Sequence, residues 1–190
     1  MLVDSHCHLE YEGLVEDQMG ALDRARDAGV ERFLNISTKQ AEWAQVVGTA
    51  RATPDVYASV GIHPHNADDH VDLTREELRA ATDEPKAIGI GETGLDYHYT
   101  AESAEVQKTS LRIHIAAARE SGLPLIIHAR DADDDMARIL REEHAQGAYS
   151  CVMHCFSSSA ELARAALDLG FYLSMSGITA FPKSRDLRDI

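Results

Sequence analysis

The amino-acid sequence predicts an α/β protein with the architecture of a TIM-type (β/α) barrel, on the basis of three observations. Short apolar runs recur along the 190 residues, and each is followed by an amphipathic or Ala-rich stretch of helical length. Runs such as 124–128 (PLIIH) are apolar on both faces, as in parallel strands that helices cover. Seven such units in succession favour a barrel, with an open doubly wound sheet as the alternative.

The seven predicted strands are runs of mostly apolar residues, at 2–6, 32–36, 56–61, 86–91, 125–128, 150–154 and 171–174. Six helical stretches lie between them, at 13–28, 40–52, 74–81, 101–121, 132–146 and 159–168. Glycines follow the ends of four of these helices, as C-capping glycines often do: Gly29, Gly122, Gly147 and Gly170.

The length sets an expectation for the domain organisation. A chain of 190 residues can build one substantial core but not comfortably two. A complete barrel has eight units and usually about 250 residues. We therefore expect residues 1–190 to form a single (β/α)-barrel domain that stops after its seventh strand, with the C-terminal strand and helix missing.

The charge and the cysteines restrict the class of protein. A net charge of −14 disfavours a purely electrostatic nucleic-acid binder, although bound divalent cations can reverse the local field and permit phosphate chemistry. The sequence has neither a signal-peptide pattern nor an apolar run of about 18 residues, so no membrane association is expected. Cys7, Cys151 and Cys155 lack metal-site spacing, which suggests structural thiols and a reduced, cytoplasmic location.

Histidines end the first predicted strand. His6 and His8 are two residues apart, so in an extended segment both imidazoles point to one face and can converge on one ion. The alternative for such a pair is two hydrogen-bonded histidines at a strand end.

Glu92 directly follows the fourth predicted strand. Burial of a carboxylate is costly unless it is paired or bound to a metal, and its two oxygens could bridge two cations. Glycines on either side (Gly89, Gly91 and Gly94) would let the backbone approach closely. The alternative is a glutamate that caps the next helix.

Three more strand ends carry histidine. His63 and His65 follow the third predicted strand, and His128 and His154 end the fifth and the sixth. Each alone could be an ordinary core or rim histidine. Together with the first and fourth strands they place His or Glu at one end of the sheet, where barrel active sites form. Nitrogen and carboxylate donors of this kind suit two divalent cations: Zn²⁺, Mn²⁺, Mg²⁺ or Co²⁺.

These motifs resemble the TatD family of metal-dependent hydrolases, in the family's order and over nearly all 190 residues. DSHCHLE is similar to the family's DxHxHL start, and residues 59–64 (SVGIHP) to its G-x-HP segment. Residues 91–97 (GETGLDY) resemble its GE-x-GLD-Y segment. PLIIHAR (124–130) and HCFS (154–157) resemble its fifth- and sixth-strand signatures.

The resemblance implies a two-metal centre in which His6 and His8 hold one metal, His128 and His154 hold the other, and Glu92 bridges them. It implies metal-dependent hydrolysis of DNA, often as a 3′-to-5′ exonuclease on single strands, so DNA or another phosphodiester is the expected partner. The remaining assignments divide by role: Glu92, His63 and Asp96 are candidate catalytic or ligand-orienting residues, and Arg130 and His65 are candidate substrate contacts.

The family also supplies an Asp from an eighth strand, so we expect weak or no activity from a chain that ends before it. Two alternatives stay open. One is an amidohydrolase acting on a cyclic amide or small ester, although such enzymes commonly carry a bridging Lys where this chain has Glu92. The other is an inactive, truncated barrel that binds metal.

Overall fold

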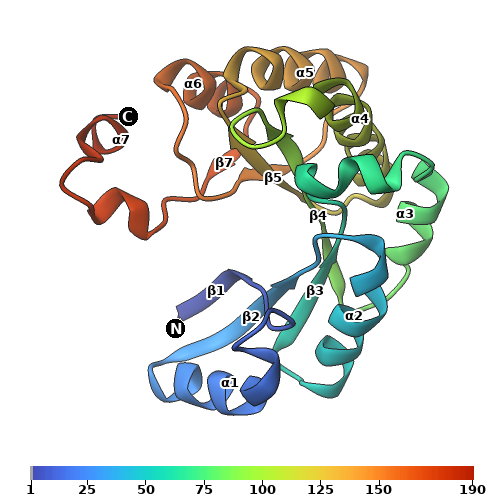
Figure 1. Ribbon diagram of the computed structural model, residues 1–190, viewed down its shortest axis with the longest axis vertical. Coiled ribbons are helices and arrows are strands. Elements are labelled where there is room, and N and C mark those ends of the chain that lie inside the picture. Colours follow the sequence, from blue (N-terminus) through green and yellow to red (C-terminus); the bar gives the residue numbers. More distant parts are fainter. Residues whose placement is uncertain (1) are drawn as a thin grey trace.

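The computed structural model describes residues 2–190 and confirms the predicted α/β, TIM-like fold. Within that range, parallel strands pair side by side in chain order and curl into a half-barrel, with helices on its outer side (Figure 1). The strands are β1 (Leu2–Cys7), β2 (Val30–Ile36), β3 (Val56–Val60), β4 (Ala87–Asp96), β5 (Leu125–Arg130), β6 (Cys151–Met153) and β7 (Tyr172–Leu173).

All six predicted helical stretches contain a helix. The α-helices are α1 (Gln18–Asp27), α2 (Trp43–Ala52), α3 (Arg75–Ala81), α4 (Ala104–Ser121), α5 (Asp133–Gln146), α6 (Ala160–Asp168) and the short α7 (Arg185–Arg188). Short 3₁₀ helices precede three of them: η1 (Val15–Asp17), η2 (Gln40–Glu42) and η4 (Ala101–Ser103). No helix in residues 2–190 is long and apolar enough to cross a membrane.

Side-chain caps fix two helix starts. Thr74 accepts a hydrogen bond from the backbone N–H of Glu77, and the Glu77 side chain accepts one from the Thr74 backbone, which completes a capping box before α3. Ser159 accepts from the N–H of Leu162 at the start of α6. These contacts explain why the sequence placed both starts within one residue.

The fourth strand is longer than predicted. We expected it to end at Gly91, with Glu92 beyond it, but β4 runs on to Asp96. Its pairing with β5 continues through this segment, with Thr93 opposite Ile127 and Asp96 opposite Arg130. Glu92 therefore lies within a strand, which excludes the alternative of a helix-capping glutamate.

Two short 3₁₀ helices had no counterpart in the prediction: η3 (Pro64–His70) and η5 (Gly177–Ala180). His63 precedes η3, and its side chain accepts a hydrogen bond from the backbone N–H of His65. The turn brings His65 back over the end of β4, where its Nε2 lies 2.9 Å from Oδ2 of Asp96.

The core lies between the sheet and the helices. The larger cluster of buried residues joins β4 and β5 to α4 and α5, with Leu111, Leu125 and Ile139 fully buried. His114, also fully buried in α4, accepts a hydrogen bond from the backbone N–H of Ile62 at 2.9 Å. Burial lowers the pKa of His114 to about 4, so this ring is a neutral acceptor that fixes the chain next to His63.

β3 and β4 approach each other closely where the polar strand ends begin. A Cβ atom at Gly61 would lie only 2.4 Å from the Cα of Gly91. Gly61 therefore needs to be glycine, because any side chain there would push the two strands apart. Gly91 needs to be glycine for another reason: its φ is +128°, and a Cβ there would lie 2.5 Å from the carbonyl oxygen of Ile126.

We predict opposite effects from two Gly→Ala substitutions. Gly61→Ala should lower the free energy of unfolding by about 1–3 kcal/mol or more, because the added methyl overlaps β4. Gly48→Ala, in α2 with nothing within 4 Å of the new methyl, should raise it by about 0.5–1 kcal/mol. Urea unfolding of the two variants measures both changes. A neutral Gly61→Ala would show that the strands are not in close contact.

Candidate metal centre

A buried carboxylate, that of Glu92, lies at the centre of the polar strand ends. Glu92, in β4, is only 5% exposed. Its Oε2 lies 3.3 Å from Nε2 of His6 and 3.8 Å from Nε2 of His8. Its Oε1 lies 3.4 Å from Nδ1 of His128 and 3.8 Å from Nε2 of His63. Each oxygen of this one carboxylate therefore faces two imidazoles.

The group around Oε2 has the geometry of a metal site. The Nε2 atoms of His6 and His8 lie 3.2 Å apart. Two ligand nitrogens on a tetrahedral zinc ion, each about 2.0–2.1 Å from it, are about 3.3 Å apart. The His6–His8 and His6–Glu92 separations match this value, so the triangle formed with Glu92 fits one cation.

Hydrogen bonds fix which nitrogens are free to bind a metal. Nδ1 of His8 lies 3.1 Å from the carbonyl oxygen of Ile36, to which it must donate, so Nε2 keeps its lone pair. Nε2 of His128 lies 2.9 Å from Oδ2 of Asp96, which leaves Nδ1 toward Glu92. In both cases the nitrogen that faces Glu92 is the one available as a ligand.

His63 differs from His8 and His128. The ligand atoms of His63, Glu92 and His128 all lie within 4.8 Å of one another. However, Nδ1 of His63 accepts the backbone N–H of His65 at 3.2 Å. The proton of the neutral ring is then on Nε2, which faces Glu92 as a donor. This tautomer favours a hydrogen-bonding role for His63 over metal ligation.

His154 lies beside the first group. Its ring stacks on that of His6, with centroids 3.4 Å apart and planes 11° from parallel. It lines the same hollow as His8 and Glu92 but belongs to neither three-residue group of metal donors found in residues 2–190. Its assignment to a second metal stays a prediction.

Asp96 links the strand ends to one another. Its Oδ2 lies 2.9 Å from Nε2 of both His65 and His128, and its Oδ1 accepts the backbone N–H groups of His98 and Tyr99 at 3.0 Å. Burial alone would raise the pKa of Asp96, but these hydrogen bonds outweigh it and lower the pKa to about 2. Asp96 is thus an ionised group that holds His128 by a hydrogen bond, and its role in catalysis stays a prediction.

The protonation states suit a divalent cation. Burial lowers the pKa of both His63 and His154 to about 4, and it lowers the pKa of His8 as well. Burial would raise the pKa of Glu92, but hydrogen bonds with His128 and His6 hold it well below its usual range. Burial would also lower the pKa of His128, but its hydrogen bonds with Glu92 and Asp96 raise it instead. His8, His63 and His154 are therefore the rings that burial keeps neutral beside the Glu92 carboxylate. Neutral nitrogens and a carboxylate are the donors that borderline divalent metals prefer, and a cation in place of the proton on Nδ1 would make His128 one of them.

The centre opens into a hollow of about 490 Å³. Its lining includes three residues that the sequence did not indicate, Tyr11, Thr38 and Asn66. The ring of Tyr11 stacks on that of His8, with centroids 4.4 Å apart and planes 14° from parallel. Tyr11 follows His8 by three residues in the loop that leaves β1, and this proximity was the one signal available for it.

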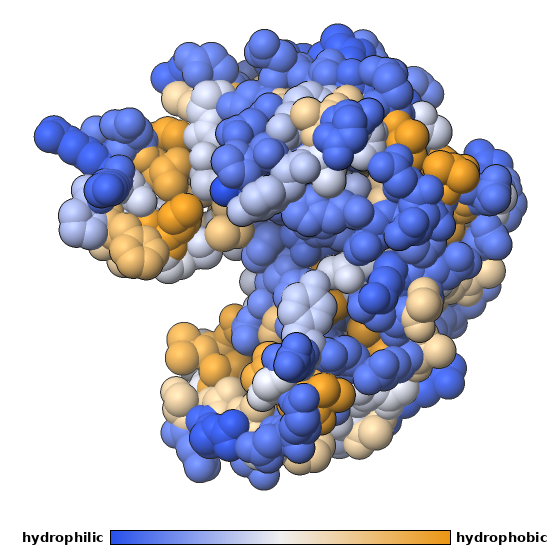
Figure 2. Space-filling model, in the orientation of Figure 1, coloured by the Kyte–Doolittle hydropathy of each residue, from blue (hydrophilic) through white to orange (hydrophobic). Residues whose placement is uncertain are grey.

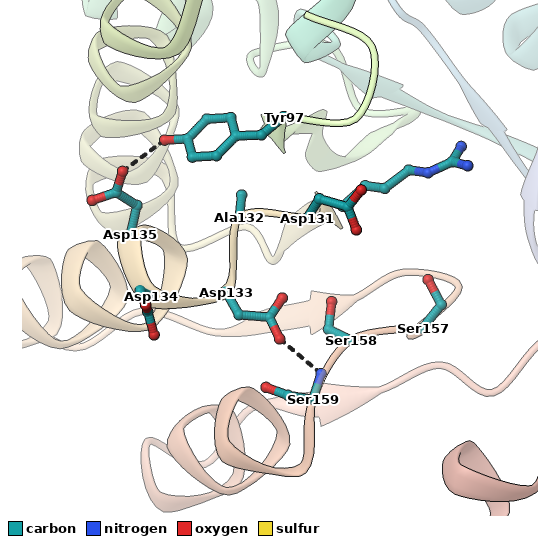
Figure 3. Close-up of a pocket in the computed structure, with 10 residues that line it drawn as sticks. Tyr97, Asp131, Ala132, Asp133, Asp134, Asp135, Ser157, Ser158 and Ser159 are labelled. Atoms are coloured by element: carbon teal, nitrogen blue, oxygen red, sulfur yellow. Dashed lines mark hydrogen bonds between the residues drawn. The ribbon is translucent and has the colours of Figure 1, made fainter. Parts of the chain in front are cut away.

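A second pocket, of about 860 Å³, lies between the turns that follow β5 and β6 (Figure 3). Four aspartates and three serines line it, with Tyr97 and Arg130. Two contacts close its walls: the Tyr97 hydroxyl donates to Asp135, and the backbone N–H of Ser159 donates to Asp133, each at 2.8 Å (Figure 3). Arg130, predicted to contact substrate, lines this pocket and not the hollow at Glu92.

The cysteines lie outside the metal-donor groups. The thiol of Cys7 is 3.4 Å from the carbonyl oxygen of Leu34, and Sγ of Cys155 is 2.9 Å from Oγ of Ser176. Cys151 is buried, and burial raises its pKa far above the usual value. Their role as structural thiols stays a prediction.

Comparisons with known proteins identify the family of this chain. A family profile described as TatD related DNase matches residues 3–190. The Escherichia coli K12 protein named "Uncharacterized metal-dependent hydrolase YcfH" is 40% identical over 191 residues, which are 99% of this chain and 71% of that protein. The Bacillus subtilis protein named "Uncharacterized metal-dependent hydrolase YabD" is 36% identical, over 100% of this chain and 74% of that protein.

A solved structure shows the same fold. The crystal structure of YjjV, a TatD homologue from Escherichia coli K12, superposes with a TM-score of 0.90 at 29% sequence identity. The match covers 99% of this chain and 73% of that chain.

We predict that divalent metal stabilises the chain through this centre. Zn²⁺, Mn²⁺ or Co²⁺ at one hundred times its Kd should add about 2.7 kcal/mol, a rise in Tm of roughly 5–10 °C. His8→Ala should reduce the rise because it removes a ligand, whereas His144→Ala, in α5 beside Tyr149, should not. Thermal unfolding with and without metal measures this. Equal shifts in both variants would place the metal elsewhere.

Proposed function

Because the chain belongs to the TatD family of metal-dependent hydrolases, we propose that it hydrolyses the phosphodiester bonds of DNA, as a 3′-to-5′ exonuclease on single strands. The observation that carries the proposal is the position of Glu92, with two histidines at each of its oxygens. Such a carboxylate can be shared between two cations, and two neighbouring cations suit displacement at phosphorus.

Two sets of residues, which share Glu92, would each hold one of the two cations. His6, His8 and Oε2 of Glu92 would hold one cation, and Oε1 of Glu92 with His128 the other, with His154 added by the family resemblance. When bound, the pair would lower the pKa of a shared water and neutralise charge on the attacking and leaving oxygens.

The protein's own groups would then position the substrate. Nε2 of His63 carries a proton and faces the hollow beside Glu92, so it can donate to a phosphate oxygen. Asp96 holds His128 in the orientation that leaves Nδ1 toward Glu92. His65, whose side chain is 39% exposed, stands at the rim of the hollow as a substrate contact. Arg130, on the wall of the neighbouring pocket, is the second proposed substrate contact.

The main rival function is an amidohydrolase for a small cyclic amide or ester. The acidic charge of −14 is compatible with a small neutral substrate. The bridging position argues against it, since Glu92 stands where such enzymes commonly carry lysine. The two functions therefore differ in substrate while sharing the same metal centre.

We predict metal-dependent cleavage of an end-labelled single-stranded oligonucleotide, abolished by chelator. Glu92→Ala should lower kcat/KM by more than about a hundredfold. Loss of a residue that only hydrogen-bonds to a metal ligand already costs about 10–100-fold, and Glu92 would contact the metals directly. His128→Ala should cost less, because this histidine serves one cation and Glu92 serves both. Glu161→Ala, on the exposed surface of α6, is the matched control.

Two results would count against the proposal. If His128→Ala and Glu92→Ala were equally impaired, Glu92 would not serve both cations. If no divalent metal supported cleavage while cyclic amides or small esters were hydrolysed, the amidohydrolase function would replace it.

A further inference from the structure

An exposed tyrosine is tied to the metal centre through Asp96. Tyr99, in the loop after β4, is 60% exposed. Its backbone N–H donates at 3.0 Å to Oδ1 of Asp96, the carboxylate whose other oxygen holds His128. Its ring lies 5.5 Å from that of His65, nearly perpendicular to it. The contacts of Tyr99 hold its ring near the metal centre. His65 lies between this ring and His128, the proposed metal ligand.

Arg130 supports this ring. Its guanidinium carbon lies 4.6 Å from the centre of the Tyr99 ring, within the range of a cation–π contact. Arg130 forms no ion pair within residues 2–190, although the chain is strongly acidic. An aromatic ring paired with an arginine beside a phosphodiester-cleaving centre has the chemistry of a base-stacking surface for single-stranded nucleic acid.

The charge around Arg130 favours a base over a further phosphate. The pocket that Arg130 lines also carries the carboxylates of Asp131 and Asp133 (Figure 3). A phosphate placed in this pocket would be repelled by these groups, whereas an uncharged nucleobase would not. The neutral part of a nucleotide therefore suits the Tyr99 side of the centre, and its phosphate suits the metals.

We propose that Tyr99, supported by Arg130, is the surface on which the nucleobase next to the scissile phosphodiester stacks. The substrate class is then a single strand with unpaired bases, because the bases of a duplex are already stacked and cannot reach the ring. This inference rests on the proposed phosphodiesterase function.

A simpler role for Tyr99 makes a different prediction. If the ring only held Arg130 in position to contact phosphate, the loss of the ring would affect every phosphodiester alike. A stacking surface instead affects only substrates that have a base beside the scissile bond.

The test uses the metal-loaded protein and two single-stranded oligomers that differ only in the terminal residues, thymidine in one and abasic tetrahydrofuran in the other. Tyr99→Ala should raise KM for the thymidine oligomer roughly 10-fold, with kcat little changed, since one stacked base is worth about that factor. For the abasic oligomer the same variant should differ from the native chain by less than about twofold. Tyr99→Phe should retain the native KM for both. Tyr172→Ala, a 72% exposed tyrosine in β7, is the control.

Equal losses on the two oligomers, or no loss on either, would overturn the stacking role while leaving the phosphodiesterase function intact. If the native chain cleaved neither oligomer with any metal, the proposed function itself would fail and the stacking role with it. The native chain therefore tests the proposed function, and the Tyr99 variants test the stacking role.

Discussion

The buried carboxylate of Glu92 is the constraint on which the rest of the centre depends. A charge at 5% exposure is costly unless other groups compensate for it. Here the compensation comes from segments far apart in the sequence. β1 supplies His6, β5 supplies His128, and the segment that follows β3 supplies His63. Pairing in chain order brings β3, β4 and β5 together, and the curl of the sheet brings β1 back toward β4 (Figure 1).

The same centre shows why one histidine cannot substitute for another. His8 donates a ring proton to the carbonyl oxygen of Ile36, and His128 donates one to the carboxylate of Asp96. The other nitrogen of each ring is therefore free for a metal. His63 accepts at Nδ1, so its free nitrogen is a donor. All three residues are histidines that follow or end a strand. What distinguishes them is the hydrogen bond at the ring nitrogen that points away from Glu92, because it determines whether the other nitrogen can bind a metal or can only donate a proton.

Much of this arrangement could be predicted from the sequence. Apolar runs and glycines located every strand, and the recurrence of His or Glu at strand ends located the centre. The extension of β4 to Asp96 could not be predicted, because it depends on pairing with β5. The extended segment is rich in glycine, and its strand propensity alone predicts a loop. The ring contacts of Tyr11 and Tyr99 were also beyond prediction, since both residues lie in loops after a strand, where no periodic pattern indicates the direction of a side chain.

The central claim is that Glu92 is shared between two cations, and anomalous diffraction from crystals soaked in Mn²⁺ tests it most directly. The account predicts two anomalous peaks about 3.5–4 Å apart, one toward His6 and His8 and one toward His128, each bonded to a different oxygen of Glu92. A single peak, or two peaks of which only one contacts Glu92, would contradict it.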